Sequence, residues 1–242
     1  ELEIIKPEEE ARLAVISCAP LVSTKTEQLL VVDIGGGSTE LVWIDLTNVP
    51  ERERPRAIMR LHKGFKSDPG PFAAARVVDW ISVPLGVATL RDQFEDVEDD
   101  AARFALMSWF FEESLEDFSP YAAAQTREGF QIVGTSGTVT TVAASHLGLK
   151  RYDRTKVDGL RMSTDQIDAV IQNYLNMGPA GRRADPRIGK DRQALIMSGA
   201  AILQTLMRLW PTDRLSVADR GLREGLLYAQ MSAHGVLEDT PY

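Results

Sequence analysis

Short apolar runs and longer amphipathic segments follow one another along this chain. Residues 29–34 (Leu-Leu-Val-Val-Asp-Ile) form a near-continuous apolar run, which is typical of a strand buried on both faces. After a glycine turn, residues 38–45 predict a second strand, and residues 56–62 predict a third strand of the same meander. Residues 130–134 and 215–218 are shorter apolar runs, and they predict two more buried strands late in the chain.

Helical periodicity fills the segments between these strands. Pro7 and the three glutamates after it are typical of a first helical turn, because carboxylates oppose the positive end of a helix. The predicted helices cover residues 7–18, most of 72–117 with a break at 84–86, 138–146, 164–177, 191–209 and 222–233. Alternating strands and helices predict an α/β fold with a mixed sheet flanked by helices. In such sheets, ligands bind at the carboxyl ends of the strands.

Composition and charge narrow the range of functions. The 242 residues are 44% hydrophobic and 26% charged, which is typical of a soluble globular protein. Cys18 is the single cysteine, so a disulfide framework is excluded, and the three histidines form no zinc pattern. The net charge of −8 argues against nucleic acid as a partner, and no run approaches the ~20 apolar residues of a membrane span. We therefore expect a cytoplasmic protein with no membrane partner.

The first glycine turn carries the clearest chemistry. Its residues are Asp33, Gly35, Gly36, Gly37, Ser38 and Glu40. Consecutive glycines let backbone N–H groups converge on phosphate oxygens, and a strand-end aspartate could hold a divalent cation. Glu40 lies two residues beyond Ser38 on the predicted strand, so both side chains share one face. The alternative is a plain hairpin turn with Glu40 in solvent, and the flanking acidic residues argue against it.

A second turn joins the strand at 130–134 to a predicted helix. Its residues are Gly134, Thr135, Ser136, Gly137 and Thr138. A helix N-terminus suits an anion, although ordinary capping by Thr135 or Ser136 explains this motif equally well on its own. Together with the first turn, it predicts two phosphate-binding turns that face one cleft.

Basic residues are candidates for a polyanion track. Arg220 and Arg223 follow the last strand, where they could either reach phosphate or make structural ion pairs. A second cluster contains Arg182, Arg183, Arg187, Lys190 and Arg192. A third contains Arg60, His62, Lys63 and Lys66. The alternative for any one of these residues is a solvated face, since Asp185 and Asp191 interrupt the second cluster.

These motifs together resemble the exopolyphosphatase/guanosine pentaphosphate phosphohydrolase (Ppx/GppA) family. The resemblance runs in family order through residues 8–12 (Glu-Glu-Glu-Ala-Arg), 33–40, 82–90, 134–138 and 219–227. The Asp-Ile-Gly-Gly-Gly-Ser-Thr-Glu segment is shared in outline with other actin-like proteins. Its combination with the upstream Glu-Glu-Ala-Arg and the terminal Arg-Gly-Leu-Arg-Glu-Gly-Leu is specific to the family.

The resemblance implies an actin-like (ribonuclease H-like) fold of the ATPase superfamily and a cleft that hydrolyses terminal phosphates. It implies that Glu10 orients or deprotonates the attacking water and that Glu40 is also catalytic, with Asp33 and Glu40 at a Mg²⁺ or other divalent cation. It implies phosphate binding by Gly35, Gly36, Gly37, Ser38, Gly134, Ser136, Gly137 and Thr138. The implied substrates are inorganic polyphosphate or guanosine pentaphosphate, and a homodimer is compatible with the family.

Two departures from the family pattern bear on activity. The chain begins at Glu1 and carries no Asp-x-Gly-Ser-type turn, so we expect residues 1–20 to be the tail of a first actin-like domain and 21–242 to be the second. Thr135-Ser136 also stands where the family often has a further glycine. The sequence is also compatible with two other functions. One is a polyphosphate or alarmone sensor without turnover, and the other is another actin-like ATP-binding protein.

Overall fold

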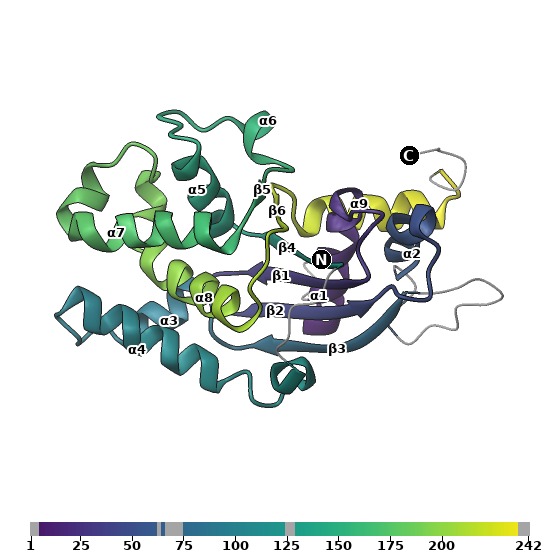
Figure 1. Ribbon diagram of the computed structural model, residues 1–242, viewed down its shortest axis with the longest axis horizontal. Helices are drawn as coiled ribbons and strands as arrows, with labels where there is room; N and C mark the ends of the chain where they lie inside the picture. Colours follow the sequence, from purple (N-terminus) through teal and green to yellow (C-terminus); the bar gives the residue numbers. More distant parts are fainter. Residues whose placement is uncertain (1–4, 62–63, 66–74, 124–128, 237–242) are drawn as a thin grey trace.

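The computed structural model describes residues 5–61, 64–65, 75–123 and 129–236, and in them a six-stranded mixed sheet (Figure 1). The strands lie in the order β3-β2-β1-β4-β6-β5. Their bounds are Gln28–Ile34 (β1), Thr39–Asp45 (β2), Arg76–Val83 (β3), Phe130–Thr135 (β4), Arg161–Met162 (β5) and Leu215–Ala218 (β6). The predicted α/β class and mixed sheet are confirmed.

The pairing of the strands positions the candidate site. β2 runs antiparallel to β1 and to β3, so β1, β2 and β3 form the meander that the sequence indicates. β1 and β4 are parallel, as are β4 and β6. The carboxyl ends of β1, β4 and β6 therefore meet at one edge of the sheet, and the predicted ligand-binding turns follow all three.

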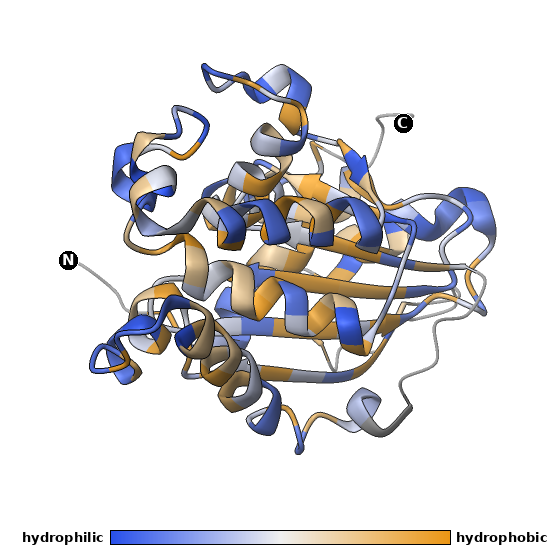
Figure 2. Cartoon of the chain, turned by 60° about the vertical axis from the view of Figure 1, so that its left-hand side comes forward, coloured by the Kyte–Doolittle hydropathy of each residue, from blue (hydrophilic) through white to orange (hydrophobic). Residues whose placement is uncertain are grey.

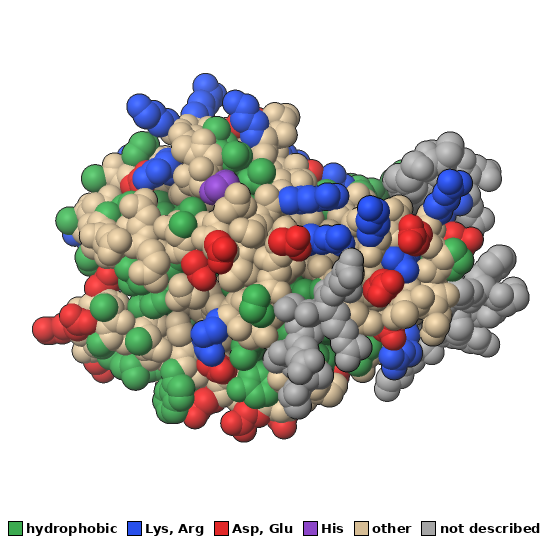
Figure 3. Space-filling model, viewed as in Figure 1, with side chains coloured by type: hydrophobic (Ala, Val, Ile, Leu, Met, Phe, Trp, Pro, Cys, Tyr) green, Lys and Arg blue, Asp and Glu red, His purple; other side chains and the backbone are tan. Residues whose placement is uncertain are grey.

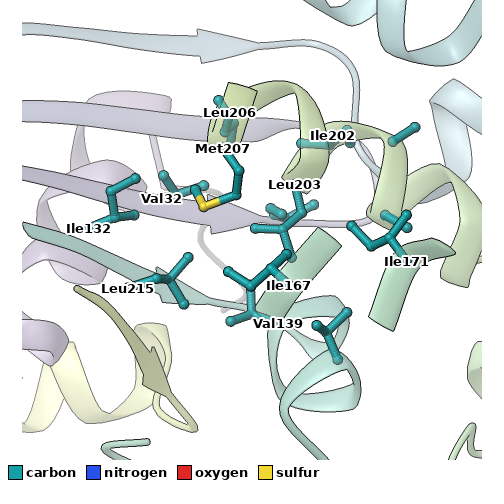
Figure 4. Packing of buried hydrophobic residues seen from close by; sticks show 14 of the residues in the cluster. Val32, Ile132, Val139, Ile167, Ile171, Ile202, Leu203, Leu206, Met207 and Leu215 are labelled. Carbon is teal, nitrogen blue, oxygen red and sulfur yellow. The ribbon is translucent and has the colours of Figure 1, made fainter. Parts of the chain in front are cut away.

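Helices cover both faces of the sheet, and its strands are largely hydrophobic (Figure 2). Alternate residues of β1 enter different cores, because successive side chains of a strand point to opposite faces. On one face lie α3 (Val87–Gln93), α4 (Asp100–Glu113), α5 (Gly137–His146), α7 (Thr164–Ala184) and α8 (Ile196–Leu209). Figure 4 shows this larger core, where Val32 and Ile132 of the sheet lie under Leu203 and Met207 of α8.

The other face is covered by α1 (Pro7–Cys18) and α2 (Arg54–Arg60), and α9 (Leu222–Ala233) packs on α1. The crossing of α1 and α9 is unusually close. A methyl group added at Gly225 of α9 would lie 2.1 Å from the carbonyl oxygen of Leu13. This contact fixes the turn before α9 relative to α1 and its glutamates.

Most predicted elements are confirmed, with two exceptions. The strand predicted at 56–62 is wrong: residues 54–60 form α2, which begins around Pro55. The mostly helical stretch predicted from residue 72 is also wrong at its start, because residues 76–83 form β3 along β2. α7 extends past its predicted end to Ala184, with a break at Gly178, whose φ is 62°.

Shorter elements complete the described part of the chain. They are α6 (Arg154–Val157) and the 3₁₀ turns Ala19–Leu21, Glu51–Glu53, Ser119–Ala123 and Lys190–Arg192. The candidate basic residues His62, Lys63 and Lys66 lie outside the described residues. Among the helices that the structure describes, none combines the length and the apolarity that crossing a membrane requires.

Candidate functional site

A cavity of about 1030 Å³ opens where the three parallel strands end. Its walls include residues 33–36 at the end of β1, residues 135–137 where β4 leads into α5, and residues 218–224 where β6 leads into α9. The connection from α7 to α8 and the segment after α5 close its sides. The two predicted phosphate turns therefore line one cavity, and the turn before α9 joins them.

The carbonyl groups of the first turn are hydrogen-bonded to the start of α3. The backbone N–H groups of Val87 and Ala88, at the start of α3, donate to the carbonyls of Gly35 and Gly36 at 2.9 Å. Within the described residues, no acceptor takes the N–H groups of Gly36 and Gly37. This arrangement needs glycine at position 86, where a methyl group would lie 2.5 Å from the backbone of Gly36. The turn thus leaves N–H donors for an anion.

The second turn begins α5. Ser136 is its N-cap, and the Ser136 Oγ accepts the N–H of Val139 at 3.0 Å. Gly137 lies directly under the guanidinium of Arg192, since a methyl group there would be 2.0 Å from its Cζ. Thr138 is different, because its side chain is buried against Gly199 of α8 and does not line the cavity. The predicted phosphate role of Thr138 is therefore restricted to its backbone.

The third turn is tied to its neighbours by ion pairs. The Arg220 guanidinium pairs with Asp158 at 2.9 Å. The backbone carbonyl of Arg220 accepts a hydrogen bond from the Thr135 hydroxyl. The N–H of Gly221 donates to the Glu224 side chain at 3.0 Å, which caps α9. Arg223 lines the cavity and has no ion-pair partner among the described residues. Of these two predicted arginines, Arg223 has the freer guanidinium.

Three acidic residues gather beside the first turn. Asp33 and Glu40 lie opposite each other in the β1–β2 register, on the face of the sheet that α1 covers. Glu40 is 2% exposed, and Ser82 of β3 donates its hydroxyl to Glu40 Oε1 at 2.8 Å. Glu10, in the first turn of α1, interacts electrostatically with both carboxylates. Only Asp33 of the three also lines the cavity.

Burial and, after it, like charges raise the pKa values of two carboxyl groups in this cluster. Burial, and after it the charges of Glu40 and Glu10, raise the pKa of Asp33 to about 7 from an ordinary value of 3.8. The pKa of Glu10 is also raised, by burial first and by Glu40 second. The cluster thus holds more negative charge than its surroundings neutralise, so a cation beside it would be stabilised.

The donor set fits a hard divalent cation. Mg²⁺ is usually held by one or two carboxylates, with water and substrate phosphate completing its shell. Asp33 and Glu40 offer that pair of carboxylates next to the phosphate turns. In the part of the chain that the structure describes, no group of three or more His, Cys, Asp or Glu side chains could hold a metal alone. Oxygen atoms from a phosphate substrate would be needed to complete the site.

The predicted basic residues divide into two groups. Arg187, Arg192, Arg220 and Arg223 line the cavity. Arg183 and Lys190 do not line it, and Arg182 is buried elsewhere, where its guanidinium pairs with Asp100 at 2.6 Å. Gly37, Ser38 and Gly134 also lie outside the cavity wall, although Gly134 packs closely on Val139. Arg182 therefore joins α7 to α4 through an ion pair and does not contribute to the cavity.

Several residues at the site were not assigned a role from the sequence. Ser82 and Gly86 fall inside a family motif, but only the structure gives them the contacts with Glu40 and Gly36. Tyr152 and Arg154 line the cavity, and both contact Asp219. The sequence shows only that these two residues lie in a basic stretch after α5. Their position at the cavity depends on contacts with Asp219, which is distant in sequence.

Comparison with known proteins identifies the family of the chain. The model of the "Ppx/GppA phosphatase family" matches residues 1–234, so the chain belongs to that family. A guanosine-5'-triphosphate,3'-diphosphate pyrophosphatase of Aeromonas salmonicida is 28% identical over 228 residues, which are 94% of this chain and 38% of that protein. The chain thus spans less than half the length of this curated relative.

Solved structures share the fold. The Aquifex aeolicus Ppx/GppA family member superposes with a TM-score of 0.71 at 25% identity, over 99% of this chain and 66% of that one. An exopolyphosphatase from Cytophaga hutchinsonii gives a TM-score of 0.72 at 20% identity, over 96% of this chain and 66% of that one. The actin-like α/β fold expected from the sequence is confirmed, and this chain corresponds to about two thirds of each structure.

Proposed function

We propose that this chain is part of a phosphohydrolase that releases the terminal phosphate of inorganic polyphosphate or of guanosine pentaphosphate. The observation that carries the proposal is the single cavity in which the glycine turns after β1 and β4 meet arginine side chains and Asp33. Membership of a phosphatase family supports the same reaction class. Phosphoryl transfer to water needs an in-line water, positioning and neutralisation of charge, and the turns and arginines would supply the last two.

Each residue type has a defined task in this proposal. The N–H groups of Gly36, Ser136 and Gly137 hold phosphate oxygens. Arg192 and Arg223 neutralise the charge that these oxygens carry, since a guanidinium can bind two oxygens at once. Glu10 orients the attacking water and accepts its proton, for which a raised pKa is favourable near neutral pH. Glu40 is held in place by Ser82.

A divalent cation, for which we propose Mg²⁺, would be held by Asp33 and Glu40. When bound, it would neutralise negative charge that develops on the transferred phosphate. For the whole protein, we propose that residues 1–20 are the end of a first actin-like domain and that residues 21–242 form the second. We also propose that the protein acts in the cytoplasm. Polyphosphate or guanosine pentaphosphate is its partner, with a homodimer compatible with this arrangement.

The test is phosphate release by the full-length protein and its Glu10→Gln variant. We expect wild-type protein with Mg²⁺ to release phosphate from at least one of the two substrates. Removing a positioned general base typically lowers a rate by about 10²- to 10⁴-fold, and we expect that loss for Glu10→Gln. Glu8→Gln is the matched control, because Glu8 is exposed in the same helical turn.

The outcomes separate the hydrolase from the alternatives. Normal turnover by Glu10→Gln would overturn the role of Glu10. Binding of polyphosphate by the wild-type protein without release at any concentration of divalent metal would favour a sensor. Affinity that depends on adenine, rather than on the phosphate chain, would favour an ATP-binding protein.

A further inference from the structure

Helix α4 is apolar on its outward face as well as on the face that packs into the protein. Its buried side chains belong to the larger core: Phe104, Met107 and Phe111. The opposite face of a surface helix is normally polar. In α4 it carries four exposed apolar residues at helical spacing, which we call the α4 stripe: Ala102, Ala105, Leu106 and Trp109. Trp109 is 56% exposed and Leu106 is 39% exposed, so nothing in the described part of the chain covers this face.

Acidic side chains lie at both ends of the α4 stripe. Asp99 is the N-cap of α4, where its carboxylate accepts the N–H of Ala102 at 2.7 Å. Glu113 follows Trp109 by about one helical turn, so both side chains lie on the outward face. Both carboxylates are exposed, and neither forms an ion pair with another described residue. Figure 3 shows Asp and Glu side chains toward the two ends of α4, at the lower left, with hydrophobic side chains between them.

The charge that remains around the stripe is mainly negative. The cations closest to α4 are engaged: Arg208 pairs with Glu112, and Arg182 pairs with Asp100 at 2.6 Å. Arg103 donates to a backbone carbonyl of the loop before α4 at 2.6 Å, which holds this loop against the first turns of the helix. That loop adds three exposed carboxylates without an ion pair among the described residues: Glu95, Asp96 and Glu98.

We propose that the outward face of α4 is the docking site for a basic amphipathic helix of a partner protein. The apolar side of that helix covers Leu106 and Trp109, and its Lys or Arg side chains pair with the carboxylates at both ends of the stripe. The 14 residues of α4 form a ridge about 21 Å long, which matches about four turns of a partner helix. No residue of the stripe lines the cavity, so the inference is independent of the proposed phosphohydrolase function.

The negative charge distinguishes this partner from other occupants. Two copies of the chain that met through α4 would bring acidic ends against acidic ends in a parallel or an antiparallel arrangement, and like charges disfavour such a contact. Nucleic acids and anionic lipid surfaces are disfavoured for the same reason, because both present negative charge. A protein helix with cations beside its apolar side complements both the stripe and its charged ends.

The experiment measures binding of a fluorescein-labelled peptide to the full-length protein by fluorescence anisotropy. The peptide has about 18 residues, with leucine at i, i+3, i+4 and i+7 and lysine elsewhere, so that it forms a basic amphipathic helix. We expect Leu106→Gln/Trp109→Gln to raise Kd at least about tenfold, because a large aromatic side chain at the centre of an interface contributes much of its affinity. Both side chains are exposed, so the variant should keep its fold.

Asp99→Asn/Glu113→Gln tests the charges separately from the apolar contact. Asparagine caps a helix about as well as aspartate, so α4 should keep its first turn. We expect Kd to rise about two- to fivefold at low salt. The difference from the wild type should disappear near 1 M salt, where the Debye length is about 3 Å.

Leu227→Gln/Met231→Gln is the matched control. It removes two exposed apolar side chains about one turn apart on α9, and we expect it to bind the peptide as the wild type does. An equal loss of affinity in both apolar double variants would overturn the site, as would a wild-type protein that does not bind the peptide. Equal affinity for a leucine and glutamate peptide would overturn the charge complementarity. Dimerisation that Leu106→Gln/Trp109→Gln abolishes would assign the face to a second copy instead.

Discussion

At the scale of single residues, Glu40 is a carboxylate that the sheet buries almost completely. A buried charge is costly unless it is hydrogen-bonded or paired. Ser82 on β3 donates one such hydrogen bond to Glu40. Asp33, opposite Glu40 on the neighbouring strand β1, repels its negative charge. Burying this carboxylate makes the fold less stable than an apolar side chain at the same position would. A bound ligand or cation that offsets the negative charge would explain why the carboxylate is there.

Ser82→Ala tests how much the structure depends on this hydrogen bond. We expect the free energy of unfolding to fall by about 1.5–3 kcal/mol, the range for a lost bond to a charged group. Urea denaturation of the variant and the wild type measures this difference. Ser119→Ala is the control, because its hydroxyl donates to Asp79 at the surface, where the loss should stay below about 1 kcal/mol. Equal losses would contradict the special position of Glu40.

Single residues were predictable where backbone chemistry decides their role. The glycines of the first turn and the cap Ser136 could be assigned from sequence, since glycine and serine suit such turns whatever surrounds them. Arg182 and Arg192 could not be told apart in the same way. They occur in one basic cluster, yet one pairs with Asp100 and the other lies over Gly137. Those contacts are distant in sequence.

At the scale of elements, the crossing of α1 and α9 holds Glu10 beside the sheet. Gly225 permits the close approach because it has no Cβ, and a methyl group there would collide with the Leu13 carbonyl. The backbone of Leu13 cannot yield as a flexible side chain could. The two helices would therefore have to separate if position 225 carried any larger residue.

Gly225→Ala is expected to lower the free energy of unfolding by about 1–3 kcal/mol, as overpacking does elsewhere. The measurement is again urea denaturation. Gly189→Ala is the control, because nothing lies within 4 Å of a methyl group at that position. A variant at position 225 as stable as the wild type would show that α9 can shift on α1 at little cost.

Elements were predictable where local pattern and burial agree. β1 is buried on both faces and was found from its apolar run alone. β3 was missed because it lies at the edge of the sheet, is only partly buried along most of its length and becomes a strand by pairing with β2. The short apolar run at α2 fits a strand or a helix equally well, and Pro55 at the helix start decided between them.

At the scale of the whole molecule, three parallel strands bring three turns together although about 185 residues separate the first from the last. The net charge of −8 does not predict whether an anion binds at the carboxyl ends of these strands, because the local electrostatic field decides that. We expect phosphate to bind in the cavity formed here, between the turns after β1, β4 and β6.

A crystal structure of the full-length protein grown with tripolyphosphate tests that claim most directly. We expect phosphate oxygens about 2.7–3.2 Å from the backbone nitrogen of Gly36 on one side and of Gly137 on the other. The Arg192 guanidinium should contact the same anion. Tripolyphosphate bound at another surface, with none in the cavity at saturating concentration, would show that this cavity is not the phosphate site.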